Sequence, residues 1–146
     1  MGTNSTISKL EKDGTVKSIK CHFDGYYNHN GKRLFEFYKN EEDIDELIKL
    51  GDLVSLGEHL NPPDENYDFS RALDDKITCA GYRDEDEDEI NFKEYKSLDD
   101  YFEAFFSGNL PFYNYIWIDR EWYVCDRDNI LPNNKLNNLK YVLKND

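Results

Sequence analysis

The stretch between residues 19 and 38 constrains this chain most, because its hydrophobic period changes midway from that of a strand to that of a helix. Ile19, Cys21 and Phe23 alternate with polar residues, which is typical of a half-buried strand. Asp24-Gly25 then breaks the pattern. We therefore expect a strand that ends in a turn at this dipeptide.

A helix is expected to follow this turn and to pack beneath it. Leu34, Phe37 and Tyr38 have the spacing of an amphipathic helix. The strand and the helix would hold a group of polar and aromatic side chains between them: His22, Asp24, Tyr26 and Tyr27. Rigid elements fix loop residues in place, so this turn is a reasonable binding site, although no motif in the chain specifies a reaction.

Two β-hairpins are predicted from turn residues between alternating segments. Asp13-Gly14 separates residues 6–12 from residues 15–23 and suggests a type I′ turn, which needs positive φ at both positions. Residues 112–119 and 121–125 form the second hairpin. Aromatic side chains on both faces of this second hairpin indicate that its strands are central or covered.

Trp117 and Trp122 belong to this second hairpin, and we expect both rings to be buried. The alternative is that one of them is an exposed anchor for a partner, since aromatic residues are enriched at interfaces.

Helices are predicted from caps and apolar stripes. One begins after Asn40, carries Ile44, Leu47 and Ile48 on its buried side, and ends at Gly51. A second is expected after Ser97, with Asp100 at the reciprocal capping position, and its buried side would comprise Leu98, Tyr101, Phe102 and Phe105. A last helix would follow Pro132 and carry Leu136, Leu139 and Leu143.

Residues 76–82 and 90–95 are expected to form two more strands, paired as a hairpin with the acidic run Asp84–Glu89 at its tip. Residues 58–75 are polar, contain Pro62-Pro63, and are expected to form a long surface loop or an interaction segment. The element order predicts a single α+β domain over residues 1–146, with an antiparallel β-sheet built from hairpins and helices packed on one face.

The net charge and the composition restrict the classes of partner that this chain can bind. Acidic residues number 31 against 18 basic ones, a formal charge of −13, which argues against nucleic acid or an anionic membrane as a direct partner. Neither a signal peptide nor an apolar span of membrane length is evident, so we expect a cytoplasmic protein. The three cysteines (Cys21, Cys79 and Cys125) form no CxxC pair and are interpreted as reduced, buried thiols.

Catalytic and metal chemistry find little support. His22, Asp24 and His29 could converge on a metal, but their spacing matches no known metal pattern, and such turn residues more often bond the backbone. Cys21 and His22 are neighbours on a strand and point to opposite faces, so they cannot form a dyad. We therefore predict a non-enzymatic protein without metal or cofactor.

The acidic run is the most distinctive charged feature. Six consecutive acids repel one another and remain in solvent, so a solvated loop is the simplest interpretation. The functional alternative is that these carboxylates imitate the phosphates of nucleic acid and bind a basic groove on a partner. Two further groups of acids would add to this surface: Glu41, Glu42, Asp43, Asp45 and Glu46, and then Asp99, Asp100 and Glu103.

Four ordered stretches of the chain read GTNSTI (residues 2–7), CHFDGY (21–26), GDLVSLG (51–57) and AGYRD (80–84). They resemble a family of small bacteriophage proteins in which the same stretches read GTRSTI, CHWDGYP, GDLSSLG and a YxRDRGE-like run. Trp122-Tyr123 resembles a Trp-Tyr strand near the C-terminus of that family. The resemblance covers nearly the whole chain and implies an accessory phage protein that interferes with a host process such as defence.

Departures from the family pattern shift the expected chemistry. Asn4 stands where the family has Arg, Phe23 replaces Trp, and Asn28 replaces Pro. After Arg83-Asp84, the family's basic residue and glycine give way to Glu85-Asp86. These changes remove part of any arginine-based anion site and add negative charge, which favours protein binding over nucleotide binding.

The leading hypothesis is a phage-encoded, anti-CRISPR-like inhibitor that binds a basic groove on a host nuclease or other nucleic-acid-binding defence protein. Its partner-binding residues would be Asp84, Glu85, Asp86, Glu87, Asp88 and Glu89. The rival is a protein that sequesters a nucleotide signal, with a pocket made of Asn4, Ser5, His22, Asp24, Tyr26 and Arg83. An enzyme acting on such a nucleotide comes third.

Overall fold

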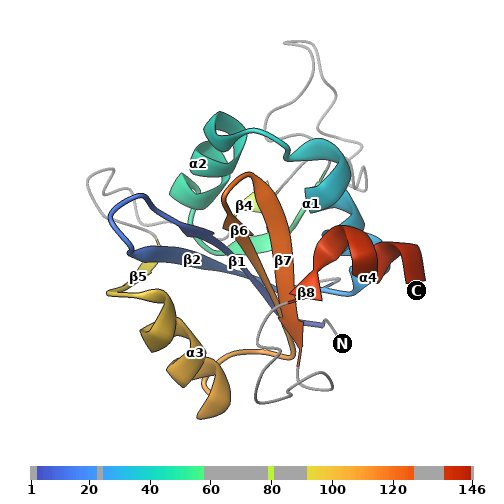
Figure 1. The fold of residues 1–146 in the computed structure, drawn as a ribbon. Coiled ribbons are helices and arrows are strands. Elements are labelled where there is room, and N and C mark those ends of the chain that lie inside the picture. The colour runs from blue at the N-terminus through green and yellow to red at the C-terminus, as the bar shows by residue number, and fades with distance from the viewer. Residues whose placement is uncertain (1–2, 23–24, 58–78, 81–91, 127–136, 146) are drawn as a thin grey trace.

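The computed structural model describes residues 3–22, 25–57, 79–80, 92–126 and 137–145 (Figure 1). Its elements, in chain order, are β1 (Ser5–Leu10), β2 (Val16–Cys21), the π-helix η1 (Tyr27–Gly31), α1 (Lys32–Phe37), α2 (Glu41–Lys49), β3 (Leu53–Ser55), β4 (Cys79–Ala80), β5 (Lys93–Tyr95), α3 (Leu98–Phe106), β6 (Tyr113–Ile118), β7 (Glu121–Asp126), β8 (Asn137–Asn138) and α4 (Leu139–Asn145). The strands join in one sheet in the order β4-β3-β2-β1-β6-β7-β8, and β5 pairs with β2 beside this path. The predicted α+β class is confirmed.

Strand β1 lies at the centre of the sheet and is paired along both edges. It runs antiparallel to β2, with Ile7 opposite Ile19, and parallel to β6, with Ile7 opposite Tyr115. A second parallel pair joins β2 to β3, where Cys21 lies opposite Leu53. The sheet is therefore mixed, whereas the sequence led us to expect an antiparallel one.

Two helical connections produce these parallel pairs. After β2 the chain forms η1, α1 and α2 and returns as β3 in the same direction. After β5, which is antiparallel to β2 and so points the same way as β6, the chain forms α3 and continues as β6. Parallel strands require such crossovers, because a tight turn can join only antiparallel strands. The alternation of apolar and polar residues predicts a strand but does not indicate which strand pairs with it.

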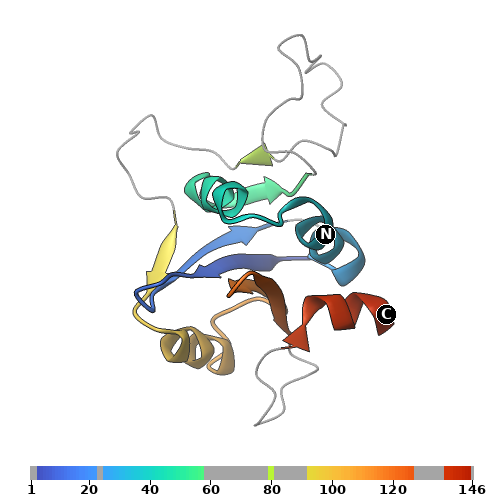
Figure 2. The same cartoon turned by 45° about the horizontal axis from the view of Figure 1, so that its top comes forward.

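Helices cover both faces of the sheet, whereas one face was expected. Figures 1 and 2 show α3 on the opposite side of the sheet from α1 and α2. Tyr115 and Trp117 of β6 join a core with residues of α1, α2 and α4, while Ile116 joins the core formed with α3. The alternating side chains of β6 thus enter two cores, which confirms the prediction that this strand is covered on both faces.

The predicted helix caps of α2 and α3 are confirmed. Asn40 Oδ1 accepts a hydrogen bond of 2.9 Å from the backbone N–H three residues on, and Ser97 Oγ accepts the equivalent bond of 3.2 Å. Gly51 and Gly108 follow the two helices with φ of 79° and 85°, a conformation that glycine adopts without strain. The last helix, α4, begins only at Leu139, after the short strand β8.

The first hairpin is confirmed, but its turn differs from the expected type I′. The Glu11 N–H bonds the Thr15 carbonyl at 2.8 Å, and Gly14 alone in this loop has positive φ, at 92°. This is the longer hairpin loop that closes with a left-handed glycine. Positive φ at two successive positions occurs instead between β6 and β7, at Asp119 (48°) and Arg120 (68°).

The expected pairing of residues 76–82 with residues 90–95 is not found where the structure describes them, at residues 79–80 and 92–95. Among the described residues, β4 pairs with β3 and β5 pairs with β2. Residues 93–95 lie along the first half of β2, where Val16 is opposite Tyr95. The acidic run and residues 58–75 lie outside the described residues.

The strand–turn–helix stretch forms with one difference in its buried side. Leu34 is fully buried and Tyr38 nearly so, whereas Phe37 is 39% exposed. A π-helix, η1, precedes α1, so the turn enters the helix through a wider coil than the sequence suggested. Tyr38 caps the end of α1 and donates from its hydroxyl to the Gly57 carbonyl at 2.8 Å.

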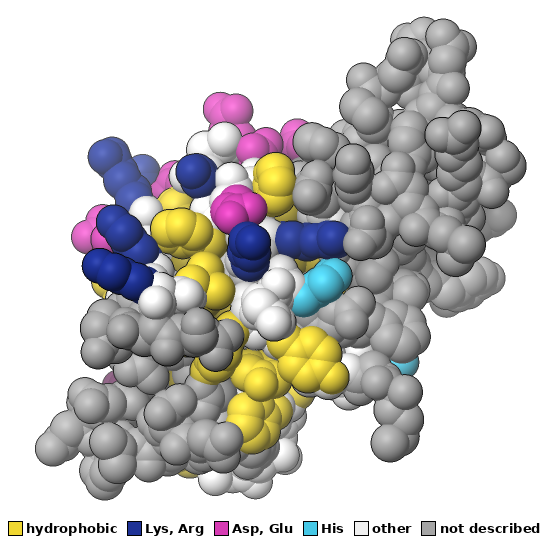
Figure 3. All heavy atoms as spheres, turned by 90° about the vertical axis from the view of Figure 1, so that its right-hand side faces the viewer, with side chains coloured by type: hydrophobic (Ala, Val, Ile, Leu, Met, Phe, Trp, Pro, Cys, Tyr) yellow, Lys and Arg dark blue, Asp and Glu magenta, His cyan; other side chains and the backbone are white. Residues whose placement is uncertain are grey.

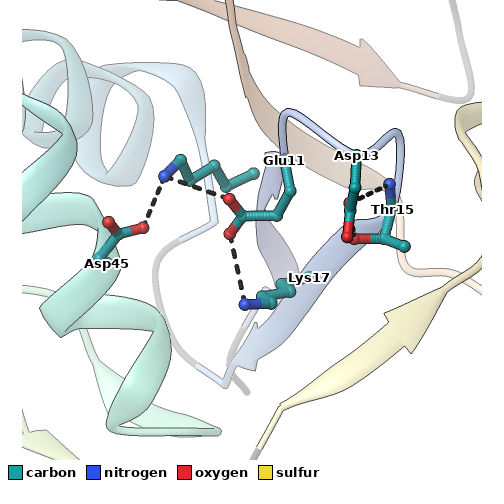
Figure 4. Close-up of polar contacts among 6 residues, drawn as sticks. Glu11, Asp13, Thr15, Lys17 and Asp45 are labelled. Carbon is teal, nitrogen blue, oxygen red and sulfur yellow. Dashed lines mark hydrogen bonds and ion pairs between the residues drawn. The ribbon is translucent and has the colours of Figure 1, made fainter.

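A buried lysine joins β1 to α2. Lys9 Nζ lies 2.6 Å from Asp45 Oδ1 and 3.5 Å from Glu11 Oε2, and Lys17 Nζ lies 3.6 Å from Glu11 Oε1 (Figure 4). Burial alone would lower the pKa of Lys9, but the hydrogen bond with Asp45 and the charges of Glu11 and Asp45 together raise it. The lysine therefore stays charged and fixes the position of α2 on the sheet.

Replacing Trp117 by Ala should destabilise the fold strongly. The ring is 4% exposed and meets Trp122 edge to face at 5.4 Å between centroids. Removing a large buried side chain leaves a cavity, so we expect a loss of about 3–5 kcal/mol in the free energy of unfolding. Denaturant titration followed by circular dichroism measures it; a parent-like midpoint would contradict the placement of this ring in the core.

Candidate functional site

The described part of the sequence-predicted ligand set comprises Asn4, Ser5, His22 and Tyr26. Asp24 and Arg83 lie outside the described residues, as do all six residues of the proposed partner-binding run, Asp84–Glu89. The structure therefore describes four residues of the predicted small-molecule site and none of the acidic run.

Asn4 and His22 meet at a cleft of about 390 Å³, which we call the β2-edge cleft. Its lining residues are Asn4, Lys20, Cys21, His22, Asp52, Leu53, Asn109 and Pro111. Ser5 and Tyr26 are not among them. Two of the four described residues of the predicted pocket thus share one cavity.

The β2-edge cleft lies along one edge of β2, where the start of the strand pairs with β5 and its end pairs with β3. Residues 16–18 pair with β5, whereas Cys21 pairs with β3. Between these partners the backbone N–H of Lys20 donates to Asp52 Oδ1 at 2.9 Å, so a side chain takes the place of a strand carbonyl. The His22 N–H then donates to the Leu53 carbonyl at 3.0 Å. Asp52 was not predicted as a site residue; it lies in the GDLVSLG stretch.

Ser5 has a structural role next to this cleft. The Asn30 side chain, which is fully buried, donates to Ser5 Oγ at 3.3 Å and to Cys21 Sγ at 3.4 Å. His29 Nδ1 lies 3.0 Å from Asn30 Oδ1. The π-helix η1 supplies both Asn30 and His29, and it places the amide against the start of β1.

The turn itself is held against the sheet by close backbone packing. The Gly25 N–H donates to the Thr3 carbonyl at 2.8 Å, and Tyr115 Oη donates to the Gly25 carbonyl at 2.6 Å. A Cβ at Gly25 would lie 2.9 Å from the Asn4 carbonyl oxygen, so no other residue fits here without a shift. Tyr26 follows and is 45% exposed, with its ring 6.2 Å from that of Tyr113.

Metal and nucleophile chemistry find no support in the described part of the chain. Residues 3–22, 25–57, 79–80, 92–126 and 137–145 contain no group of three or more His, Cys, Asp or Glu side chains that could hold a metal ion. Cys21 is buried while His22 is exposed, as the strand period predicts. Burial raises the pKa of the Cys125 thiol to about 12, so this thiol stays protonated at neutral pH.

A second cavity, of about 300 Å³, was missed by the sequence analysis, and we call it the Trp117 groove. It is lined by Phe35, Lys39, Trp117, Arg120, Glu121, Trp122, Asn138 and Lys140. Figure 3 shows the face that carries α1 and α4, where Lys and Arg side chains lie beside hydrophobic ones. A basic residue in a turn between two tryptophan-bearing strands was the sequence signal that could have indicated it.

Asp52 should stabilise the edge of β2 by accepting the hydrogen bond of the Lys20 N–H, and its negative charge should matter little. Replacing Asp52 by Ala removes the acceptor of the Lys20 N–H, and we expect a loss of about 0.5–1.5 kcal/mol in the free energy of unfolding. Asp52→Asn keeps an oxygen at this position and should stay within about 0.5 kcal/mol of the parent. Denaturant titration of both variants tests this; equal losses would show that the charge matters instead.

Comparison of this chain with protein-family models, with curated proteins and with solved structures finds no match. Across the described residues, no helix has the length and apolar character that a membrane span requires.

Proposed function

We propose that this chain is a non-enzymatic, phage-encoded inhibitor that binds a basic nucleic-acid groove on a host defence protein in the host cytoplasm. The formal charge of −13 carries this proposal, because an acidic surface is attracted to a groove that normally holds nucleic acid. The acidic run at residues 84–89 would supply the main contact.

The acidic surface of α2 is the described feature that supports this proposal. Its solvent-facing carboxylates are Glu41, Glu42 and Glu46. The helix is held to the sheet on its other side by buried Leu47 and by the ion pair between Asp45 and Lys9. Carboxylates on a rigid element keep their positions when a partner binds, which limits the entropy lost on association.

Neutralising the acidic run should remove target binding without unfolding the protein. We expect the variant with Ser or Asn at all six positions from Asp84 to Glu89 to keep the circular dichroism spectrum of the parent, because repelling exposed charges contribute little stability. The parent, immobilised and exposed to nuclease-treated bacterial lysate, should retain nucleic-acid-binding proteins that duplex DNA displaces. The variant should lose them.

A matched control separates this contact from a general effect of charge. Glu41→Gln, Glu42→Gln and Glu46→Gln together remove three exposed charges from α2 and should weaken retention only partly. Retention by the parent should also fall with added salt, since exposed charges are screened within about 8 Å at physiological ionic strength. If the run variant still retains the same proteins, the acidic run is not the contact.

A second candidate function is the sequestering of a nucleotide signal in the β2-edge cleft. The meeting of Asn4 and His22 at one cavity favours it. Asn109 adds a third polar side chain to the lining, and Lys20 adds a cation. Convergent polar groups in a cavity of this size are typical of a small-molecule site.

Ligand binding in the cleft should appear as a thermal shift that depends on His22. A bound nucleotide at a hundredfold excess over Kd should stabilise the fold by about 2.7 kcal/mol. His22→Ala should reduce this shift, and Lys96→Ala, which removes a charge outside the cleft, should leave it unchanged. A panel of cyclic and linear nucleotides in a fluorescence melt measures it. The absence of any shift would exclude this candidate, and turnover of a ligand would favour an enzyme.

A further inference from the structure

The Trp117 groove is built by three separate stretches of the chain, residues 35–39, 117–122 and 138–140. Phe35 comes from α1 and Lys39 follows that helix, whereas Arg120 occupies the turn between β6 and β7. Lys140 comes from the first turn of α4. A second hollow continues from the groove past Lys39 and Arg120 toward the start of α2. The cations are therefore gathered by the fold and not by a basic run in the sequence.

The three cations of the groove lack carboxylate partners among the described residues, which is unusual in a chain with so many acidic residues. Within the described residues, Lys39, Arg120 and Lys140 form no ion pair with a carboxylate, although acids outnumber basic residues 31 to 18. The one carboxylate in the groove lining belongs to Glu121, whose Oε2 accepts hydrogen bonds from the Tyr123 hydroxyl at 3.0 Å and from the Asn138 amide at 3.3 Å. The groove lining thus has three cations and one carboxylate, and the adjoining hollow adds the carboxylates of Glu41 and Glu42 beside Lys39 and Arg120.

The aromatic wall of the groove contains a hydrogen-bond donor without an acceptor. Trp117 is 4% exposed, and its Nε1–H has no partner among the described residues. The neighbouring Trp122 is equally buried, but its Nε1–H donates to the Tyr38 carbonyl at 2.8 Å. A buried N–H without an acceptor is unfavourable, and this one belongs to a ring that lines the groove.

Arg120 occupies a backbone position that would suit glycine better. Its φ of 68° lies in the left-handed region, and it forms a two-residue turn with Asp119, between paired Ile118 and Glu121. Turns of this kind favour glycine because a side chain strains the backbone there. The two-residue turn requires this backbone conformation, and Arg120 belongs to the groove lining.

We propose that the Trp117 groove binds a nucleoside monophosphate, with the phosphate held by Lys39, Arg120 and Lys140. Guanidinium and ammonium groups are the usual phosphate donors in proteins. The base would lie against half-buried Phe35 and the edge of Trp117, which supply an apolar surface beside the cations. The site is separate from the β2-edge cleft and does not depend on the proposed binding of a defence protein.

Calorimetric titration of the full chain with AMP tests the site, with inorganic phosphate and adenosine as the two partial ligands. We expect AMP to bind with a Kd below ~1 mM and each partial ligand to bind at least about tenfold more weakly. Lys140→Ala should weaken AMP binding by about tenfold or more, since a hydrogen bond to a charged group is lost. Lys96→Ala removes the same charge outside the groove and should have no effect.

Arg120→Gly separates binding from stability because the two effects have opposite signs. Glycine relieves the left-handed strain, so the ligand-free protein should melt about 2–4 °C higher than the parent. The same change removes the guanidinium and should weaken AMP binding by about tenfold or more. A stabilised variant that binds normally would overturn the proposal, and so would the absence of AMP binding by the parent. AMP binding that is lost in His22→Ala but kept in Arg120→Gly would place the ligand in the β2-edge cleft and would also overturn it.

Discussion

The fold depends on how the polar side chains of β1 are satisfied inside the sheet. β1 is paired along both edges and covered on both faces, yet it contains Thr6 and Ser8 at almost fully buried positions. Thr6 Oγ1 donates to Asn114 Oδ1 of β6 at 2.7 Å, and Ser8 Oγ donates to Ser18 Oγ of β2 at 2.8 Å. A slip of one residue in either register would leave these buried groups without partners, which is costly. The bonds therefore specify the alignment of three strands.

The same requirement ties the helices to the sheet. The Tyr101 hydroxyl of α3 lies 3.1 Å from Thr6 Oγ1 on one face, and Asp45 of α2 pairs with Lys9 on the other. Asn30 from η1 satisfies Ser5 near the start of β1. Each layer thus meets β1 through at least one polar contact within an otherwise apolar core, and the apolar packing adds the bulk of the stabilisation.

Features set by short stretches of sequence could be predicted, and those set by distant partners could not. Asn40 and Ser97 cap their helices through bonds to residues three positions away, so the local sequence was sufficient. The parallel pairing of β1 with β6 depends on a strand more than a hundred positions along the chain, and the strand period does not report it. The pairing of β5 with β2 was missed for the same reason.

The candidate sites follow the same division. Asn4 and His22 lie in stretches that drew attention through their motifs, and both line the β2-edge cleft. Ser5 came with them but packs into the buried cluster around Asn30. The Trp117 groove collects residues from three stretches of the chain that carry no shared motif, so only the fold reveals it. The positive φ of Arg120 in this groove could not be predicted either. Turns with positive φ are usually recognised in a sequence by glycine, and this turn consists of Asp119 and Arg120.

The central place of β1 has a consequence for synthesis on the ribosome. Thr6 and Asn114 are 108 positions apart, so at about 5–20 residues per second the N-terminal hairpin waits roughly 5–20 seconds for the strand that covers its open edge. An apolar edge left open for that time would recruit strands from other nascent chains. The hydroxyl of Thr6, whose partner Asn114 is not yet synthesised, would bond water during this interval and make β1 a poorer template for such pairing. The side chain that aligns β1 with β6 in the finished sheet would thus also make the unfinished sheet less prone to aggregation.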